Sequence, residues 1–142
     1  MTVAYFDSSA LVKLYADEEH CEAVRSVSEL PVAISFARVE VVAAFFGKVR
    51  SGELTRMVAR VLSDAFLADW DDGRMLGIAV TAPIEAEAVE LAGKHLLSGF
   101  DALHLASANA VRRVIPECTQ FVCFDERLSM AAQGEGFTLR TG

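Results

Sequence analysis

The first structural unit of the chain lies in residues 3–15, VAYFDSSALVKLY. Val3–Phe6 is a short apolar run of the kind found in buried strands, and apolar residues at helical spacing predict a helix over Ser8–Tyr15. Asp7 stands between the two. A short buried strand that passes directly into a helix is typical of α/β proteins.

The same order of elements continues to the end of the chain. Further strands are expected at Val32–Ser35, Met75–Thr81, Phe121–Phe124 and Phe137–Leu139. Further helices are expected at Glu18–Leu30, Phe36–Arg50, Glu53–Asp71, Pro83 to about Leu97, Asp101–Arg113 and Glu126–Gln133. Strands that alternate with helices predict an α/β fold with a central parallel sheet flanked by helices on both faces.

Two of these helices carry extensive apolar surface. The helix at 36–50 is apolar on most of its surface, so we expect it to be buried. The helix at 53–71 is amphipathic. Its predicted apolar face consists of Leu54, Val58, Val61, Leu62, Ala65 and Phe66.

Length and composition predict one globular domain over residues 1–142. The 53% of hydrophobic residues argues against disorder, and the start of the chain lacks the features of a signal peptide. No apolar run is long enough for a membrane span. Three cysteines without a CxxC pair are expected to be reduced packing residues, as in the cytoplasm. The net charge of −7 opposes nonspecific nucleic-acid binding but suits a basic protein partner.

Four acidic residues stand within or directly beside apolar sequence: Asp7, Glu40, Asp101 and Asp125. A carboxylate in such surroundings must be paired, hydrogen-bonded or metal-bound, because an isolated buried charge is very costly. Carboxyl ends of parallel strands share one edge of a sheet, so Asp7 and Asp125, each one residue beyond a predicted strand, are expected on the same edge. Convergence of all four on a shared Mg²⁺ or Mn²⁺ would satisfy them, since hard cations prefer oxygen ligands.

Each carboxylate also has a simpler explanation. Asp7, Asp101 and Asp125 could each cap the start of a helix by accepting a backbone N–H. Glu40 lies inside a helix and could instead pair with Arg38 or a distant base. The joint pattern favours the metal site, and four carboxylates at one place suggest phosphate chemistry, with one or two metals.

Neighbouring polar residues leave several roles open. His104 lies one turn after Asp101 on the same helical face. It could be a metal ligand, but the favoured interpretation is a core histidine with its hydrogen bonds satisfied. Ser8 and Ser9 could cap the first helix, and Ser9 could also hydrogen-bond a metal ligand. Lys13 could touch a phosphate, although a solvated lysine is slightly favoured.

Four segments carry a resemblance to a known family. YFDSSALVKLY, ARVEVVAAF, GFDALHLASA and FVCFDERL, which contain these four acids in order, resemble the PIN-domain nucleases and most closely the VapC toxins of toxin–antitoxin pairs. The resemblance covers nearly the whole chain. It implies a single PIN-like domain, with the family's metal-binding acids at Asp7, Glu40, Asp101 and Asp125 and its small polar residue at Ser9. Asp125 corresponds to the most variable of these acids.

The resemblance also implies a function. It implies a Mg²⁺- or Mn²⁺-dependent cytoplasmic endoribonuclease whose substrate is RNA, with transfer RNA as the commonest target in the family. It further implies a homodimer that is inhibited by a cognate VapB-like antitoxin. The metal site and the phosphate chemistry also follow from the four acids, whereas the RNA substrate, the homodimer and the antitoxin come from the resemblance alone.

Two alternatives come from other classes. A haloacid-dehalogenase-type phosphatase also has an Asp after its first strand, but it needs a second Asp two residues later, where this chain has Ser9. A non-catalytic PIN-like interaction module would not need the acidic residues, which are all present here. A metal-dependent RNA cleavage assay separates these alternatives.

Overall fold

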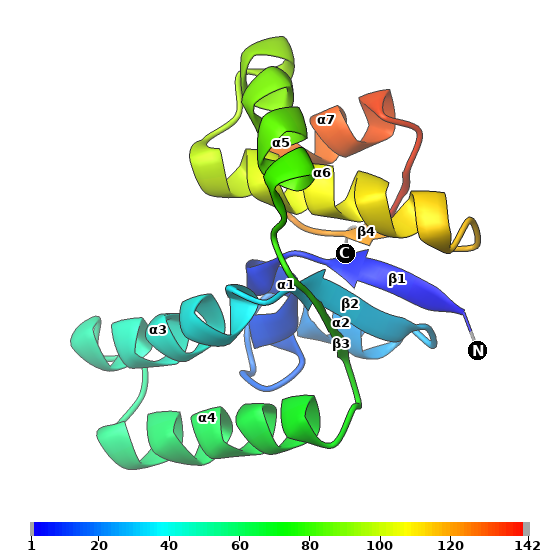
Figure 1. The fold of residues 1–142 in the computed structure, drawn as a ribbon. Coiled ribbons are helices and arrows are strands. Elements are labelled where there is room, and N and C mark those ends of the chain that lie inside the picture. Colours follow the sequence, from blue (N-terminus) through cyan, green and yellow to red (C-terminus); the bar gives the residue numbers. More distant parts are fainter. Residues whose placement is uncertain (1, 141–142) are drawn as a thin grey trace.

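A computed structural model describes residues 2–140 of the chain (Figure 1). The strands are β1 (Val3–Phe6), β2 (Leu30–Ile34), β3 (Leu76–Ile78), β4 (Gln120–Val122) and β5 (Thr138–Arg140). The helices are α1 (Ser8–Lys13), α2 (Cys21–Arg25), α3 (Ala37–Arg50), α4 (Arg56–Asp71), α5 (Ala82–His95), α6 (Gly99–Val114) and α7 (Glu126–Gly134).

The strands form one parallel sheet in the order β3-β2-β1-β4-β5. Tyr5 of the central strand β1 is paired on one side with Val32 and on the other with Phe121. Parallel neighbours need a crossover between them, and the helices provide it. The predicted α/β fold with a parallel sheet is therefore confirmed.

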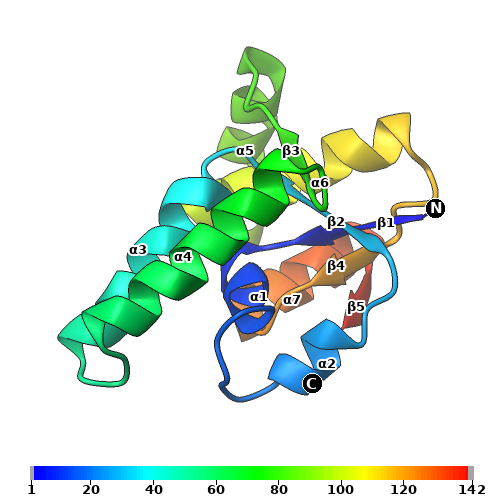
Figure 2. The same cartoon turned by 90° about the horizontal axis from the view of Figure 1, so that it is seen from below.

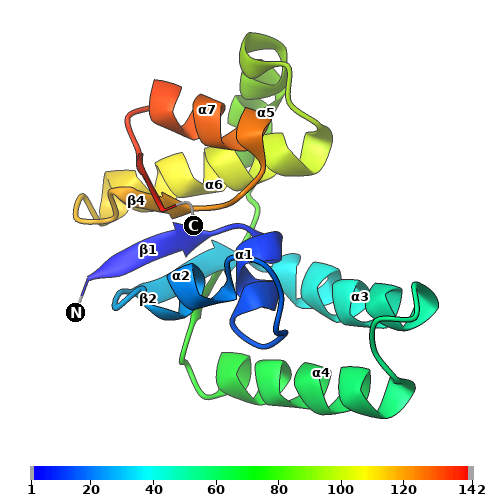
Figure 3. The same cartoon turned by 180° about the vertical axis from the view of Figure 1, so that it is seen from behind.

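Helices cover both faces of the sheet (Figures 1 and 3). The side chains of β1 point alternately into the two cores between the sheet and these helices. Val3 and Tyr5 point into the core beneath α5, α6 and α7. Ala4 and Phe6 point into the opposite core, which α1, α2, α3 and α4 cover. All four residues are buried, as expected for a central strand with helices on both sides.

The predicted helix at 18–30 is wrong over most of its length. Only Cys21–Arg25 is helical, and Leu30 already pairs with Val3 in the sheet. Pro31 cannot donate a backbone hydrogen bond and disfavours a helical residue before it, so the chain becomes extended at that point. Most other elements start or end within a few residues of the predicted bounds, the usual uncertainty at element ends.

The predicted burial of α3 and the predicted apolar face of α4 are only partly correct. On α3 only Ala37, Val41 and Phe45 are fully buried, whereas Val39 is 72% exposed. On α4 the buried residues are Ala59, Ser63 and Phe66. Val58 and Val61 of the predicted face are 41% and 61% exposed. The two helices lie side by side and extend beyond the sheet (Figure 2). Within residues 2–140 no further element covers their outer sides.

None of the helices in the described part of the chain is long and apolar enough to cross a membrane. Cys118 and Cys123 are buried, Cys21 is partly buried, and all three are free thiols, as expected for packing residues.

Candidate functional site

The carboxyl ends of three adjacent strands, β2, β1 and β4, deliver three of the four predicted acids. Asp7 directly follows β1, and Glu40 lies in the first turn of α3, the helix after β2. Asp125 was expected one residue beyond its strand. It follows after Cys123 and Phe124, because β4 already ends at Val122. All three therefore lie at one edge of the sheet, where α/β proteins commonly place their sites.

Asp7 is only 5% exposed and caps the start of α1. Its Oδ1 accepts a hydrogen bond from the backbone N–H of Ala10 at 2.9 Å and another from the hydroxyl of Ser9 at 2.9 Å. The capping interpretation is thus confirmed for Asp7, and so is the hydrogen bond from Ser9. Both bonds use the same oxygen, so capping leaves Oδ2 available for another interaction.

Asp125 and Asp101 differ in how they meet their helices. Asp125 caps α7, with Oδ1 accepting from the N–H of Leu128 at 2.8 Å. Asp101 does not cap α6, so the capping interpretation is wrong there. Ser98 is the cap, and its Oγ accepts from the N–H of Asp101 at 3.4 Å. The carboxylate of Asp101 therefore has no capping role.

Glu40 pairs across the fold rather than with Arg38. Its side chain is 28% exposed, and its Oε1 accepts from the hydroxyl of Ser8 at 2.7 Å and lies 3.3 Å from Nε2 of His104. The interpretation that Ser8 caps the first helix is therefore wrong. Burial alone would raise the pKa of Glu40, but the hydrogen bonds from His104 and Ser8 outweigh it and lower the pKa.

His104 is a buried histidine with satisfied nitrogens, as the favoured interpretation predicts. It is 2% exposed, and its Nδ1 lies 2.8 Å from the hydroxyl of Tyr5. It also contacts the site through Oε1 of Glu40. Sequence analysis assigned no role to Tyr5 and predicted a capping role for Ser8 instead of its hydrogen bond to Glu40. The alternation along the first strand, which places Tyr5 on the same side of the sheet as α6, is the signal that could have indicated Tyr5.

The carboxylates repel one another. Burial raises the pKa of Asp7, and the nearby charge of Asp101 raises it further against the opposing effect of His104. Burial also raises the pKa of Asp101, followed by the charges of Asp125 and, to a lesser extent, Glu40. Asp101 is thus close enough to Asp7, Glu40 and Asp125 for electrostatic repulsion between their carboxylates. The first turns of α6 and α7 add partial positive charge beside them.

Lys13 is not the solvated lysine that sequence analysis favoured. It is 9% exposed, its Nζ lies 2.8 Å from Oε2 of Glu18, and it lies over the ring of Phe124 at 5.3 Å from the centroid. Its charge is therefore already paired next to the site.

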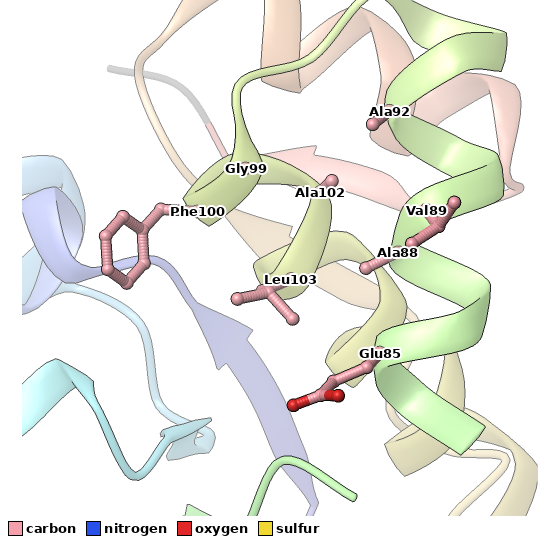
Figure 4. Close-up of a pocket in the computed structure, with 8 residues that line it drawn as sticks. All are labelled: Glu85, Ala88, Val89, Ala92, Gly99, Phe100, Ala102 and Leu103. Atoms are coloured by element: carbon pink, nitrogen blue, oxygen red, sulfur yellow. The ribbon is translucent and has the colours of Figure 1, made fainter. Parts of the chain in front are cut away.

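Two hollows lie on this half of the molecule. Asp101 and Asp125 line an open depression of about 550 Å³, together with Glu126, Arg127 and Met130. A second hollow of about 490 Å³ runs between α5 and α6 and is almost wholly apolar, with Val89, Phe100 and Leu103 along it and Glu85 at one end (Figure 4). The first hollow contains two of the predicted acids, whereas Glu85 is the one carboxylate that lines the second.

The donor chemistry of the acidic site fits a hard divalent cation, because it offers carboxylate oxygens and no thiolate. Within residues 2–140, however, no group of three or more His, Cys, Asp or Glu side chains forms a ready-made metal site. Mg²⁺ is commonly held by one or two carboxylates, with waters and substrate phosphates completing its shell. An incomplete set of protein ligands agrees with that mode of binding.

Comparison with known proteins gives two similar sequences of matching length, although the chain matches no family model. They are Ribonuclease VapC45 of Mycobacterium tuberculosis strain CDC 1551 / Oshkosh and Ribonuclease VapC49 of strain ATCC 25618 / H37Rv. Each is 36% identical over 116 residues, an alignment that covers 78% of this chain and 78% of the relative.

Proposed function

The chain belongs to the VapC family of PIN-domain ribonucleases, and from this premise we propose that it is a metal-dependent endoribonuclease that hydrolyses phosphodiester bonds in RNA. One observation supports the metal dependence: acids from distant segments meet at one sheet edge, where burial and neighbouring carboxylates raise the pKa of Asp7 and Asp101. Such an arrangement is costly for folding alone, so it marks a functional site.

Each acid has a proposed role. Asp7, Glu40 and Asp101 hold the cation, and Asp125 closes the site or holds a second ion. Ser9 fixes one oxygen of Asp7, as Ser8 does for Glu40. When bound, Mg²⁺ or Mn²⁺ supplies positive charge that activates water and offsets charge on the phosphate. No side-chain nucleophile is required.

The test is cleavage of RNA by the purified protein in the presence and absence of metal. We expect cleavage with Mg²⁺ or Mn²⁺ that stops in excess EDTA and returns when metal is restored. Transfer RNA is the first substrate to try, with single-stranded RNA of mixed sequence beside it. Cleavage that continues undiminished in EDTA would contradict the metal-dependent mechanism.

The same assay addresses the two alternatives. A non-catalytic PIN-like module would bind RNA or protein without cutting, whatever the metal. A haloacid-dehalogenase-type phosphatase would hydrolyse a phosphomonoester. It needs an acid/base carboxylate at position 9, but Ser9 instead donates its hydroxyl to Asp7, so the nuclease is favoured.

We further propose that a VapB-like antitoxin inhibits the enzyme through a basic segment that enters the acidic site. The chain has a net charge of −7, and an Arg can bind a carboxylate through two hydrogen bonds. Inhibitor and Mg²⁺ would then compete. A titration with the cognate antitoxin peptide should show weaker binding to an Asp7→Asn/Asp101→Asn variant and at higher Mg²⁺ under constant ionic strength. Unchanged affinity in both experiments would place inhibition elsewhere.

The proposed assembly is a homodimer. The apolar hollow between α5 and α6 is a candidate contact, since Val89 and Phe100 beside it are 74% and 53% exposed. Light scattering should give the mass of a dimer, and Val89→Glu should shift it toward a monomer. Val114→Glu is a suitable control, because Val114 is similarly exposed, at 81%, but does not line this hollow.

A further inference from the structure

A chain of hydrogen bonds leads from the centre of the sheet to one of the proposed metal ligands. Tyr5 is fully buried on β1, and its hydroxyl lies 2.8 Å from Nδ1 of His104. The other ring nitrogen, Nε2, lies 3.3 Å from Oε1 of Glu40. These residues come from three separate segments, β1, α6 and α3, so this series of contacts forms only in the folded protein.

The direction of these bonds follows from the chemistry of the groups. A tyrosine hydroxyl is protonated at neutral pH and can donate, whereas a carboxylate can only accept. A neutral imidazole has one donor and one acceptor nitrogen, and the bond at one nitrogen selects the role of the other. With a neutral ring, Tyr5 therefore donates to Nδ1 of His104, and Nε2–H is the donor toward Oε1 of Glu40 at 3.3 Å and toward the hydroxyl oxygen of Ser8 at 3.4 Å.

Packing fixes the histidine in this orientation. The ring of His104 meets the ring of Tyr5 edge-on, with centroids 5.8 Å apart at 74°. The ring of Tyr5 in turn stacks on Phe121, with centroids 5.2 Å apart at 28°. Both arrangements are favourable for aromatic side chains. The donor nitrogen is thus held by a part of the core that has little freedom to move.

The two donors to Glu40 approach the same oxygen. Ser8 donates to Oε1 at 2.7 Å, and Nε2 of His104 approaches Oε1 as well. Within residues 2–140, Oε2 of Glu40 has no hydrogen-bond partner. One oxygen is therefore anchored and the other is left available. This is the arrangement by which neighbouring residues commonly orient a metal-binding carboxylate.

We propose that Tyr5 and His104 are positioning residues that act through Glu40 by fixing its carboxylate for metal binding. The proposal rests on the proposed function, because it takes Glu40 to be a metal ligand. Neither residue is a candidate for contact with RNA, since Tyr5 is 0% and His104 2% exposed. Their effect is expected on metal affinity and on kcat, not on KM for RNA.

The central test compares two tyrosine-to-phenylalanine variants. Tyr5→Phe removes the hydroxyl that orients His104. Tyr15→Phe is the matched control, because the Tyr15 hydroxyl donates to Asp69 at 2.6 Å, outside the acidic site. We expect Tyr5→Phe to weaken Mn²⁺ binding, measured by calorimetry without RNA, and to lower kcat, each by about tenfold, the lower end for such outer partners. KM for RNA should stay the same, and Tyr15→Phe should change neither quantity.

A second set of variants asks whether Tyr5 acts through His104. His104→Leu should weaken Mn²⁺ binding at least as much as Tyr5→Phe, and the double variant should lose no more than His104→Leu alone. His104→Gln, which retains an N–H donor, should recover part of the loss. Equal Mn²⁺ affinities for wild type and Tyr5→Phe, or fully additive losses in the double variant, would overturn the proposal. Since Mn²⁺ binding is read without RNA, this result stands apart from whether the wild type cleaves RNA.

Discussion

Glu135 and the acids at the edge of the sheet are carboxylates with opposite electrostatic surroundings. Glu135, at the end of α7, lies 2.8 Å from Nζ of Lys94 and 2.8 Å from Nε2 of His95, and it accepts from Asn109 at 3.3 Å. Burial alone would raise its pKa, but these three partners lower it to about 2. The negative charge of Glu135 is thus balanced by side chains from α5 and α6.

The acidic edge of the sheet is the reverse case. The pKa values of Asp7 and Asp101 are raised by burial and by neighbouring carboxylates, with His104 the main opposing influence on each. Burial acts to raise the pKa in both places, so burial by itself does not explain why the net shifts have opposite signs. The difference lies in charge balance: Glu135 serves the fold, whereas the unbalanced edge makes sense as a site for a cation.

The largest expected effect is on catalysis. Asp101→Asn should lower the RNA cleavage rate by at least about a thousandfold, because it removes a proposed ligand that interacts with the other three acids. The fold should survive, since Asp101 does not cap its helix. Cleavage kinetics and circular dichroism on the same preparation measure both.

Glu135→Gln is the control for that experiment. It also removes one negative charge, but from a carboxylate that is paired with Lys94 and His95. We expect it to leave the cleavage rate within about twofold of the wild type. If Glu135→Gln were as damaging to cleavage as Asp101→Asn, with both variants folded, charge balance would not separate the functional carboxylates from the structural ones.

The next largest expected effect distinguishes Glu40, a proposed metal ligand, from His104, which is proposed to position it. Glu40→Gln should lower cleavage by roughly a hundredfold, and His104→Leu by roughly tenfold, because a residue that acts through a ligand costs less than the ligand itself. Single-turnover kinetics at saturating Mg²⁺ would measure both. A larger loss for His104→Leu than for Glu40→Gln, with both folded, would reverse the roles assigned here.

Sequence analysis predicted those features that depend on local pattern. The alternation of strands and helices, which begins with Val3–Phe6 and the helix after Asp7, predicted the parallel α/β fold. Apolar surroundings singled out the four acids, whose role in metal binding stays a prediction. The N-cap prediction also succeeded at Asp7 and Asp125, where an Asp directly precedes a helix. It failed at Asp101, because Ser98 three residues earlier already caps α6.

Features that depend on distant residues could not be predicted in this way. For Glu40 the sequence offered Arg38 or an unnamed distant base as partner, but it could not identify Ser8 and His104, which lie 32 and 64 residues away along the chain. Lys13 is buried because the segment after α1 returns and places Glu18 beside it. Periodicity shows which face of a helix is apolar, but it does not show which element will cover that face.

A smaller effect concerns the stability of the acidic edge. The folded state holds a proton on Asp7 more tightly than the unfolded state does, because its pKa is raised. The contribution of this proton to the free energy of unfolding is present at low pH and is lost as the pH rises through the raised pKa. At pH 7, without metal, Asp7→Asn should therefore melt higher, by about 3 °C, which corresponds to roughly 1 kcal/mol. Asn remains a good helix cap.

Calorimetric melting of wild type and Asp7→Asn, with and without Mg²⁺, measures this effect. Metal should raise the Tm of the wild type and leave that of Asp7→Asn nearly unchanged, so the difference between them should shrink or reverse. A lower Tm for Asp7→Asn without metal would mean that Asp7 is a net stabilising residue, like Glu135.

The smallest effect is the mirror image of this one, at Glu135. Its pKa falls from the usual 4.5 to about 2 in the folded protein, so its stabilising contribution is present above the unfolded pKa. It is lost as pH falls from about 4.5 to about 2. Glu135→Gln should lower the free energy of unfolding by about 1 kcal/mol at pH 7, a magnitude limited by solvent screening of the surrounding ion pairs.

Urea unfolding of the wild type and Glu135→Gln at pH 7 and pH 3 tests this prediction. The difference between their unfolding free energies cancels the titration of the carboxylates that both proteins share. The difference in unfolding free energy should shrink at pH 3, since there part of the Glu135 contribution has gone. A difference that stays constant between the two pH values would show that Glu135 stabilises the fold by packing and neutral hydrogen bonds, and its contrast with the acidic edge would then not be one of charge.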